Sequence, residues 1–232
     1  MSAKKKICVA GCSVSDYTEV LNPYGKILAD SLNLEYLHEG GGCGSNARIW
    51  RRVTNHVLNG NLGRNDILIV QYTEVIRTEF WSALPPFPSP VTSPDEEPWA
   101  DGGRILRWKP CANEWQPNPE EKDFFEMYEK YFVSVDFAVN NFKVNNFNFQ
   151  NMLKNCGIKT IFFTTTRIGP GTEKMPYVDE YFKPYEFFED SKEDRSQNLA
   201  PGDTCHFSQL GHNTVAKNIE EHIIKLGWIV NE

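Results

Sequence analysis

Short apolar runs alternate with helical patterns along most of this chain, and this alternation constrains its fold more than any other feature. The runs have the length and character of buried strands, and they lie at residues 6–10, 34–37, 66–72 and 158–164. Helical patterns follow the first three runs, at residues 23–32, 47–58 and 120–155. We expect Asn22 to cap the first of these helices and Gly157 to end the third. Strands that alternate with helices form a mostly parallel sheet covered on both faces. The sequence therefore predicts an α/β protein, a three-layer α/β/α sandwich with a mostly parallel sheet.

Residues from about 81 to 119 interrupt this alternation. Seven prolines fall between Pro85 and Pro110, and three tryptophans fall between residues 99 and 115. A long aperiodic stretch that is rich in aromatic side chains is typical of a packed functional excursion. At 232 residues the chain is long enough for one domain with a core of its own. We therefore expect a single domain over residues 1–232 with an irregular insertion at about 81–119.

Charge and cysteine usage exclude several classes of function. The formal net charge is -7, whereas surfaces that bind nucleic acids or anionic membranes normally carry a basic stripe. We expect neither partner. No apolar run reaches the length of a signal-peptide core or a membrane span, which predicts a cytoplasmic protein. The six cysteines lack paired or metal-ligand spacing, which predicts free thiols and no metal site. No nucleotide or flavin motif implies a cofactor.

Two distant polar segments carry the candidate chemistry. Asp203 lies three residues before His206, on a polar loop that leads into the helical pattern at residues 213–226. This spacing suits a carboxylate beside an imidazole that exchanges protons near neutral pH. Gly11-Cys12-Ser13 follows the first apolar run, and the carboxyl ends of parallel strands meet at one edge of a sheet. We predict that Ser13 is a nucleophile, His206 its base and Asp203 the group that orients His206.

Four blocks in this order resemble the SGNH, or GDSL-like, hydrolase family. They are Gly11-Cys12-Ser13 after the first strand, Gly44-Ser45-Asn46 after the second, Tyr72-Thr73-Glu74 after the third and Asp203-x-x-His206 near the end. The resemblance covers essentially the whole chain and implies the α/β/α fold of that family. It also implies acyl transfer through Ser13, His206 and Asp203. The implied oxyanion hole includes the backbone N–H groups of Ser13 and Gly44.

The third donor of that oxyanion hole departs from the family pattern. The family has an asparagine where the simplest alignment places Glu74, and a carboxylate repels a developing oxyanion. Either the Thr73 hydroxyl or the Asn46 amide replaces that donor, or the hole is weakened. We favour Asn46, because its turn faces the nucleophile and an amide is a suitable donor. Thr73, Glu74 and Arg77 are candidates for substrate contact, with Arg77 either paired to Glu74 or bound to an anionic group.

Two further residues near these blocks have a structural interpretation. Cys12 stands where the family has an aspartate, and we expect its thiol to be inert packing because no base is nearby. His212 falls in the first turn of the last helical pattern. We expect it to be a structural hydrogen-bonding residue and not a second base.

The function that these observations favour is a serine esterase that forms an acyl-enzyme on Ser13. Its partner is then a small-molecule or glycan ester, and the aromatic insertion favours an acetylated carbohydrate because aromatic side chains stack on sugar rings. Two alternatives stay open from the sequence. One is a non-catalytic glycan-binding protein on the same scaffold, and the other is an O-acyltransferase.

Overall fold

The structure is a computed structural model that describes residues 4–15, 20–41, 44–82, 104–108, 119–164, 181–182 and 206–229. Its main sheet has the strand order β2-β1-β3-β6-β7, and all of its neighbouring strands are parallel. The strands are β1 (Lys6–Ala10), β2 (Glu35–Glu39), β3 (Ile67–Tyr72), β6 (Lys159–Thr164) and β7 (Tyr181–Phe182). The predicted mostly parallel sheet is therefore confirmed, and the first four strands fall within two residues of the apolar runs.

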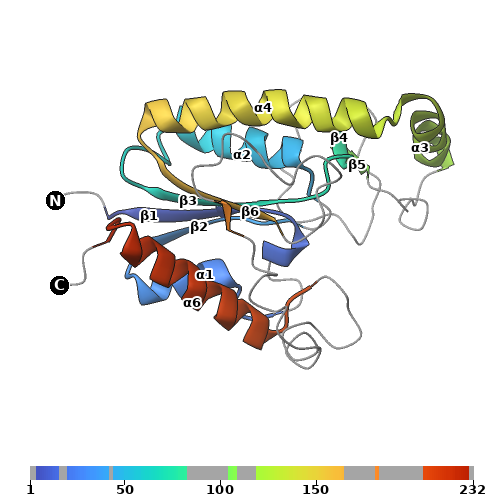
Figure 1. The fold of residues 1–232 in the computed structure, drawn as a ribbon. Helices are drawn as coiled ribbons and strands as arrows, with labels where there is room; N and C mark the ends of the chain where they lie inside the picture. Colours follow the sequence, from blue (N-terminus) through green and yellow to red (C-terminus); the bar gives the residue numbers. More distant parts are fainter. Residues whose placement is uncertain are drawn as a thin grey trace.

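Helices cover both faces of this sheet (Figure 1). One face carries α1 (Tyr24–Ser31) and α6 (Gln209–Lys225), which contact each other. The other face carries α2 (Asn46–Leu58) and α4 (Val135–Cys156). The predicted three-layer α/β/α sandwich is confirmed by this arrangement.

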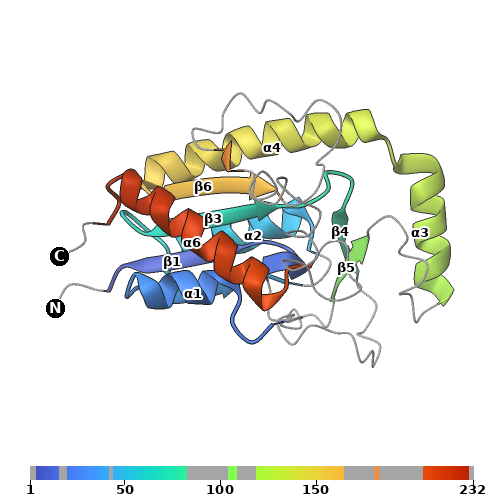
Figure 2. The ribbon, with the colours of Figure 1, turned by 60° about the horizontal axis from the view of Figure 1, so that its bottom comes forward.

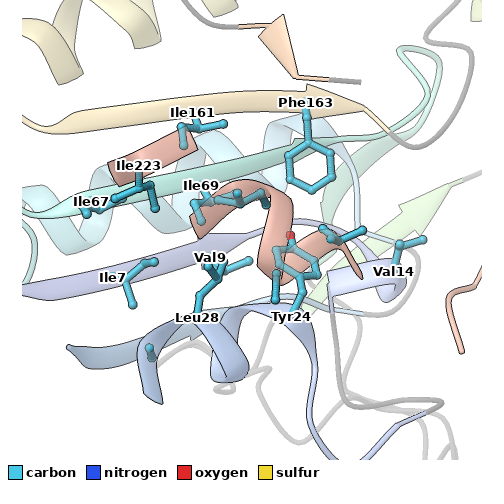
Figure 3. Close-up of a cluster of buried hydrophobic side chains, with 14 of the residues drawn as sticks. Ile7, Val9, Val14, Tyr24, Leu28, Ile67, Ile69, Ile161, Phe163 and Ile223 are labelled. Carbon is cyan, nitrogen blue, oxygen red and sulfur yellow. The ribbon is translucent and has the colours of Figure 1, made fainter. Parts of the chain in front are cut away.

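The central strand β3 shows why its sequence is continuously apolar. All six of its residues are buried, because both faces of the strand are covered. Ile67 and Ile69 point into the core beneath α1 and α6 (Figure 3), and Leu68 and Val70 point into the core beneath α2 and α4. The period of two that is usual for a half-exposed strand is absent for this reason.

The first helix begins one residue later than predicted. Pro23 occupies the N-cap position of α1, and no side chain caps the helix there. The predicted cap, Asn22, has its backbone bound by another element instead: the Gln209 side chain of α6 donates to the Asn22 carbonyl at 2.9 Å and accepts from the Asn22 N–H at 3.4 Å. The prediction of an Asn22 cap was wrong because a residue 187 positions away holds this segment.

The helical pattern at residues 120–155 is two helices and not one. They are α3 (Pro119–Phe132) and α4, which meet at an angle (Figure 2). Ser134 ends the continuity because its extended backbone and its hydroxyl cap α4, accepting from the Phe137 N–H at 3.3 Å. Gly157 ends α4 in the left-handed conformation, with φ of 70°, as the sequence predicted.

Part of the predicted insertion is regular structure. Strands β4 (Thr78–Ser82) and β5 (Arg104–Trp108) form an antiparallel pair. Phe80 of β4 packs edge-on against Phe124 and Tyr128 of α3. Residues 83–103 and 109–118 lie outside the described residues.

Two further predictions concern the cysteines and membrane-spanning segments. Cys8, Cys12 and Cys156 are free thiols, and the other three cysteines lie outside the described residues. Of the helices that the structure describes, none combines the length and the apolar character that a membrane span requires.

Candidate active site

Ser13 and His206 come together at the carboxyl edge of the sheet. Ser13 begins a single 3-10 turn, η1 (Ser13–Ser15), three residues after β1 ends. His206 lies three residues before α6 begins. The Ser13 Oγ and His206 Nε2 atoms are 2.8 Å apart, which is hydrogen-bond distance between residues 193 positions apart.

This contact has the geometry of an alcohol beside its proton acceptor. Both side chains are half-buried, so the pair is shielded from bulk solvent but not sealed from it. A neutral imidazole whose Nε2 faces a hydroxyl can accept the hydroxyl proton. Asp203, predicted to orient His206, lies outside the described residues.

Gly44 lies directly against the turn that holds Ser13. A Cβ atom at Gly44 would be 3.3 Å from the Gly11 carbonyl oxygen and 3.5 Å from the Cys12 Cα, so the two loops are in close contact. The Gly44 N–H donates to the Gly41 carbonyl at 3.1 Å. A substrate oxygen bound at Gly44 would therefore have to share or replace that hydrogen bond.

Asn46 binds the backbone beyond β3. Its Nδ2 donates to the Thr73 carbonyl at 2.9 Å, and its Oδ1 accepts from the Thr73 N–H at 3.0 Å. The side chain is buried, and Ser45 caps the same helix by accepting from the Arg48 N–H. One N–H of the Asn46 amide therefore donates to the Thr73 carbonyl. The second N–H is the donor that was predicted for the oxyanion hole.

The three predicted substrate contacts lie just after β3. Thr73 is fully buried, and its hydroxyl oxygen has no hydrogen-bond partner within the part of the chain that the structure describes. The Arg77 Nε donates to Glu74 Oε2 at 2.9 Å, and both side chains are partly exposed. Of the two roles left open for Arg77, the structure shows the ion pair.

Gln71 is a site residue that was not predicted: in the sequence it is only the polar residue that follows the apolar residues 67–70. It is fully buried on β3, and its Oε1 accepts from the Cys12 N–H at 3.1 Å and from Ser15 Oγ at 3.0 Å. The Cys12 Sγ lies 3.3 Å from the same oxygen. The available signal was an amide within an otherwise apolar strand, because a buried amide needs partners.

His212 is a structural residue behind the site. It is buried in the first turn of α6, and its Nδ1 accepts from the Tyr24 backbone N–H at 3.1 Å. Its ring stacks on the Tyr24 ring. Burial, and secondarily the nearby charge of His206, lower the pKa of His212 to about 4. His212 is therefore neutral at pH 7, in agreement with the structural role expected for it.

A partly buried ion cluster lies at the end of β2, next to Gly41. Glu39, at the end of β2, is paired with Arg52 through both carboxylate oxygens and also contacts His56. Burial raises the pKa of Glu39, but hydrogen bonds from Arg52 and His56 outweigh burial and lower it. Arg48 donates to the Glu39 carbonyl at 3.0 Å, and its guanidinium fills the space where a Cβ of Gly41 would lie.

Metal binding has no candidate group within the described ranges: no set of three His, Cys, Asp or Glu side chains there is arranged to hold an ion.

No protein-family model matches the chain. No curated protein matches it either.

Several solved structures resemble the chain in fold. A lipolytic protein of the G-D-S-L family from Veillonella parvula has a TM-score of 0.54 at 9% identity, covering 95% of this chain and 99% of that one. The psychrotrophic esterase EstA from Pseudoalteromonas sp. has a TM-score of 0.53 at 10% identity, covering 96% and 98%. The lipase/acylhydrolase from Enterococcus faecalis has a TM-score of 0.52 at 12% identity, covering 94% and 95%. The chain therefore has the SGNH/GDSL-like hydrolase fold.

Proposed function

We propose that this protein is an SGNH-type serine ester hydrolase. The observation that carries the proposal is the 2.8 Å contact between Ser13 Oγ and His206 Nε2. The contact lies at the carboxyl edge of a parallel sheet, where α/β proteins bind their ligands. The fold that the chain shares with structures named as esterases and acylhydrolases supports the same class of reaction.

The proposed reaction has two acyl-transfer steps. Ser13 Oγ attacks the ester carbonyl while His206 Nε2 accepts its proton, and the imidazolium then protonates the leaving alcohol. Water next attacks the acyl-enzyme with His206 again as the base, and the acid leaves as Ser13 regains its proton. Asp203 is proposed to hold the other ring nitrogen of His206.

The negative charge that develops on the carbonyl oxygen of the substrate ester needs hydrogen-bond donors to stabilise it. We assign the backbone N–H groups of Ser13 and Gly44 and the Asn46 amide to that role. Support for the first two comes from the close packing of Gly44 on the Ser13 turn. In Asn46, one N–H and the oxygen of the amide bind the Thr73 backbone, and the second N–H is the donor that we assign. Removal of one such donor typically lowers the rate by about 10²–10³-fold.

The substrate that we propose is a small acyl ester, with an acetylated carbohydrate as the leading class. The support is the aromatic content of the insertion, which includes Trp99 and Trp115. Aromatic side chains of this kind stack on apolar sugar faces.

The proposal is tested with p-nitrophenyl acetate and with a fluorophosphonate probe that labels activated serines. We expect slow hydrolysis and a single label on Ser13, identified by peptide mass spectrometry, and both disappear in Ser13→Ala. Ser31→Ala is the matched control because Ser31 is exposed at the end of α1. Its activity is expected to equal that of the parent.

Hydrolysis by the Ser13→Ala protein at the parental rate would overturn the nucleophile. A correctly folded parent that neither hydrolyses esters nor takes the label would favour the glycan-binding alternative. Product analysis with a sugar or alcohol as a second acceptor separates the hydrolase from the O-acyltransferase, because only the latter forms a new ester in preference to free acid.

A further inference from the structure

Gln71 is a buried amide in a strand whose four preceding residues are apolar. It has 0% exposure, as have Ile67, Leu68, Ile69 and Val70. Burial of an amide disfavours folding unless its donor and acceptor are paired. An apolar side chain at this position would carry no such desolvation cost. Packing alone therefore does not explain why the residue is an amide.

The hydrogen bonds of Gln71 fix the orientation of its amide. Its Nε2 donates to the Tyr72 carbonyl at 3.0 Å, and its Oε1 faces the Cys12 N–H and the Ser15 hydroxyl. A reversed amide would place N–H groups against the Cys12 N–H, so only one assignment satisfies both sides. The acceptor oxygen therefore points at the turn that carries Ser13.

Gln71 Oε1 supplies a hydrogen-bond acceptor just beyond the last paired residues of β1 and β3. The last paired residues of β1 and β3 are Ala10 and Val70. Two residues after Ala10, the Cys12 N–H donates to the Gln71 side chain and not to a backbone carbonyl of β3. The hydrogen bond holds the residue immediately before Ser13 against the sheet.

The same oxygen also holds the far end of the Ser13 turn. Ser15 ends η1 and donates to Gln71 Oε1, so the Ser15 hydroxyl accepts from the Tyr24 hydroxyl at 2.7 Å. The Tyr24 backbone N–H in turn donates to His212 of α6. One chain of hydrogen bonds thus links β3, the Ser13 turn, α1 and α6.

The space around this oxygen leaves no room for a side chain at Gly11. A Cβ atom there would lie 2.7 Å from Gln71 Oε1 and 2.4 Å from Ser15 Oγ. The glycine before Cys12 is therefore required by the approach of the Gln71 amide to the turn.

We infer that Gln71 is a positioning residue for the nucleophile: its Oε1 fixes both ends of the turn around Ser13 so that Ser13 Oγ meets His206 Nε2. The inference rests on the proposed function. Gln71 is held away from the reacting atoms by Cys12 and Ser15, so its effect is on the alignment of the attacking oxygen. Small displacements of a reacting atom have large kinetic effects.

The test replaces the amide with an apolar side chain of similar length. In Gln71→Met we expect kcat for p-nitrophenyl acetate to fall by about 10–100-fold while KM changes by less than about threefold, because alignment is lost and binding is kept. The rate of fluorophosphonate labelling falls in parallel.

Two further variants keep the test decisive. Ser15→Ala removes one of the two anchors and is expected to lower kcat by less than Gln71→Met, and the double variant loses no more than Gln71→Met alone, because both act on one oxygen. Gln150→Met, which removes an amide from α4 on the other side of the sheet, is the matched control and keeps parental kcat. Rates are compared per folded molecule, with near-ultraviolet circular dichroism as the check.

Equal kcat in Gln71→Met and Gln150→Met would overturn the inference and leave the proposed function intact. Amide hydrogen exchange at Cys12 reads the anchor independently of turnover. Faster exchange in Gln71→Met supports the anchor even if neither protein hydrolyses esters, a result that would overturn the proposed function alone. Unchanged exchange at Cys12 would overturn the anchor.

Discussion

His206 and His212 are six residues apart and have opposite environments. His206 is half-buried and meets the Ser13 hydroxyl, whereas His212 is 2% exposed and accepts from the Tyr24 backbone. The accepting Nδ1 requires the tautomer with its proton on Nε2. A proton added at Nδ1 would face the Tyr24 N–H. His212 is therefore suited to connect α6 with α1 and unsuited to accept protons near neutral pH.

This difference predicts how stability depends on pH. The pKa of His212 is about 4 in the folded protein and about 6.5 in an unfolded chain. Between these pH values the unfolded chain binds a proton at His212 that the native state lacks. The stability that neutral His212 contributes is therefore fully present above about pH 6.5 and is lost as the pH falls toward 4. The total effect is about 3 kcal/mol. Urea unfolding at pH 7.5, 6 and 5 measures the part of this effect that appears by pH 5, about 2 kcal/mol.

The matched variants are His212→Asn and Asn213→Ala. Asparagine at position 212 keeps an acceptor for the Tyr24 N–H but does not titrate, so the fall in stability between pH 7.5 and 5 becomes smaller than in the parent. Asn213→Ala, on the same helix, replaces an exposed side chain that does not titrate and keeps the parental slope. An equally steep slope in His212→Asn would contradict the low pKa.

At the scale of elements, the start of α2 organises one side of the site. Ser45 caps the helix, Asn46 binds the Thr73 backbone and Arg48 supports Gly41. The loops that follow β2 and β3 are thereby attached to one helical turn. The helix itself needs only the Ser45 cap and its apolar face, so Asn46 and Arg48 are available for contacts between elements.

Asn46 is consequently expected to affect both stability and activity. Asn46→Ala leaves the Thr73 N–H and carbonyl without their partner, and a buried unpaired group costs about 1–3 kcal/mol. We expect a fall in unfolding free energy of that order, with ester turnover lowered by about 10²-fold or more. Thermal melting and p-nitrophenyl acetate hydrolysis measure the two effects.

Asn46→Asp tests the donor directly. Aspartate keeps an oxygen for the Thr73 N–H but replaces the Nδ2 donor with a carboxylate oxygen that faces the Thr73 carbonyl. We therefore expect a loss of stability at least as large as in Asn46→Ala, with low turnover. If Asn46→Asp retains parental turnover, the amide is a bridge between α2 and β3 and not a donor to the oxyanion.

At the scale of the whole molecule, the sheet separates two apolar cores. Val9 and Ile69 belong to the core beneath α1 and α6, and Leu68 and Val70 belong to the core beneath α2 and α4 (Figure 3 shows the first). Neighbouring residues of one strand therefore serve different cores. Loss of either core removes the support of the same strand.

This architecture predicts one cooperative unfolding transition. Ile69→Ala and Leu68→Ala each remove a fully buried side chain and are expected to lower the unfolding free energy by about 2–5 kcal/mol. Far-ultraviolet circular dichroism and tryptophan fluorescence should give the same urea midpoint in each variant. Leu58→Ala is the control, since Leu58 is 77% exposed. Separate midpoints from the two probes would contradict a single cooperative unit.

The order of strands and helices was predictable because it depends on local patterns. The apolar runs of β1 and β3 match strands that are buried on both faces, and Gly157 ends α4 in the left-handed conformation that glycine permits. The break at Ser134 was missed because the apolar period continues across it. Asn22 was assigned as a cap because nothing nearby in the sequence shows that Gln209 binds its backbone.

Local sequence pattern accounts for the strand order along the chain, the sandwich and the two segments that supply Ser13 and His206. These follow from hydrophobic period, turn chemistry and residue type, which act over a few positions. Folding alone brings Ser13 to 2.8 Å from His206, commits Asn46 to the Thr73 backbone and turns Gln71 toward the nucleophile. Hydrogen-bond partners 27 to 193 residues apart depend on the packing of the layers, and no local period encodes that packing.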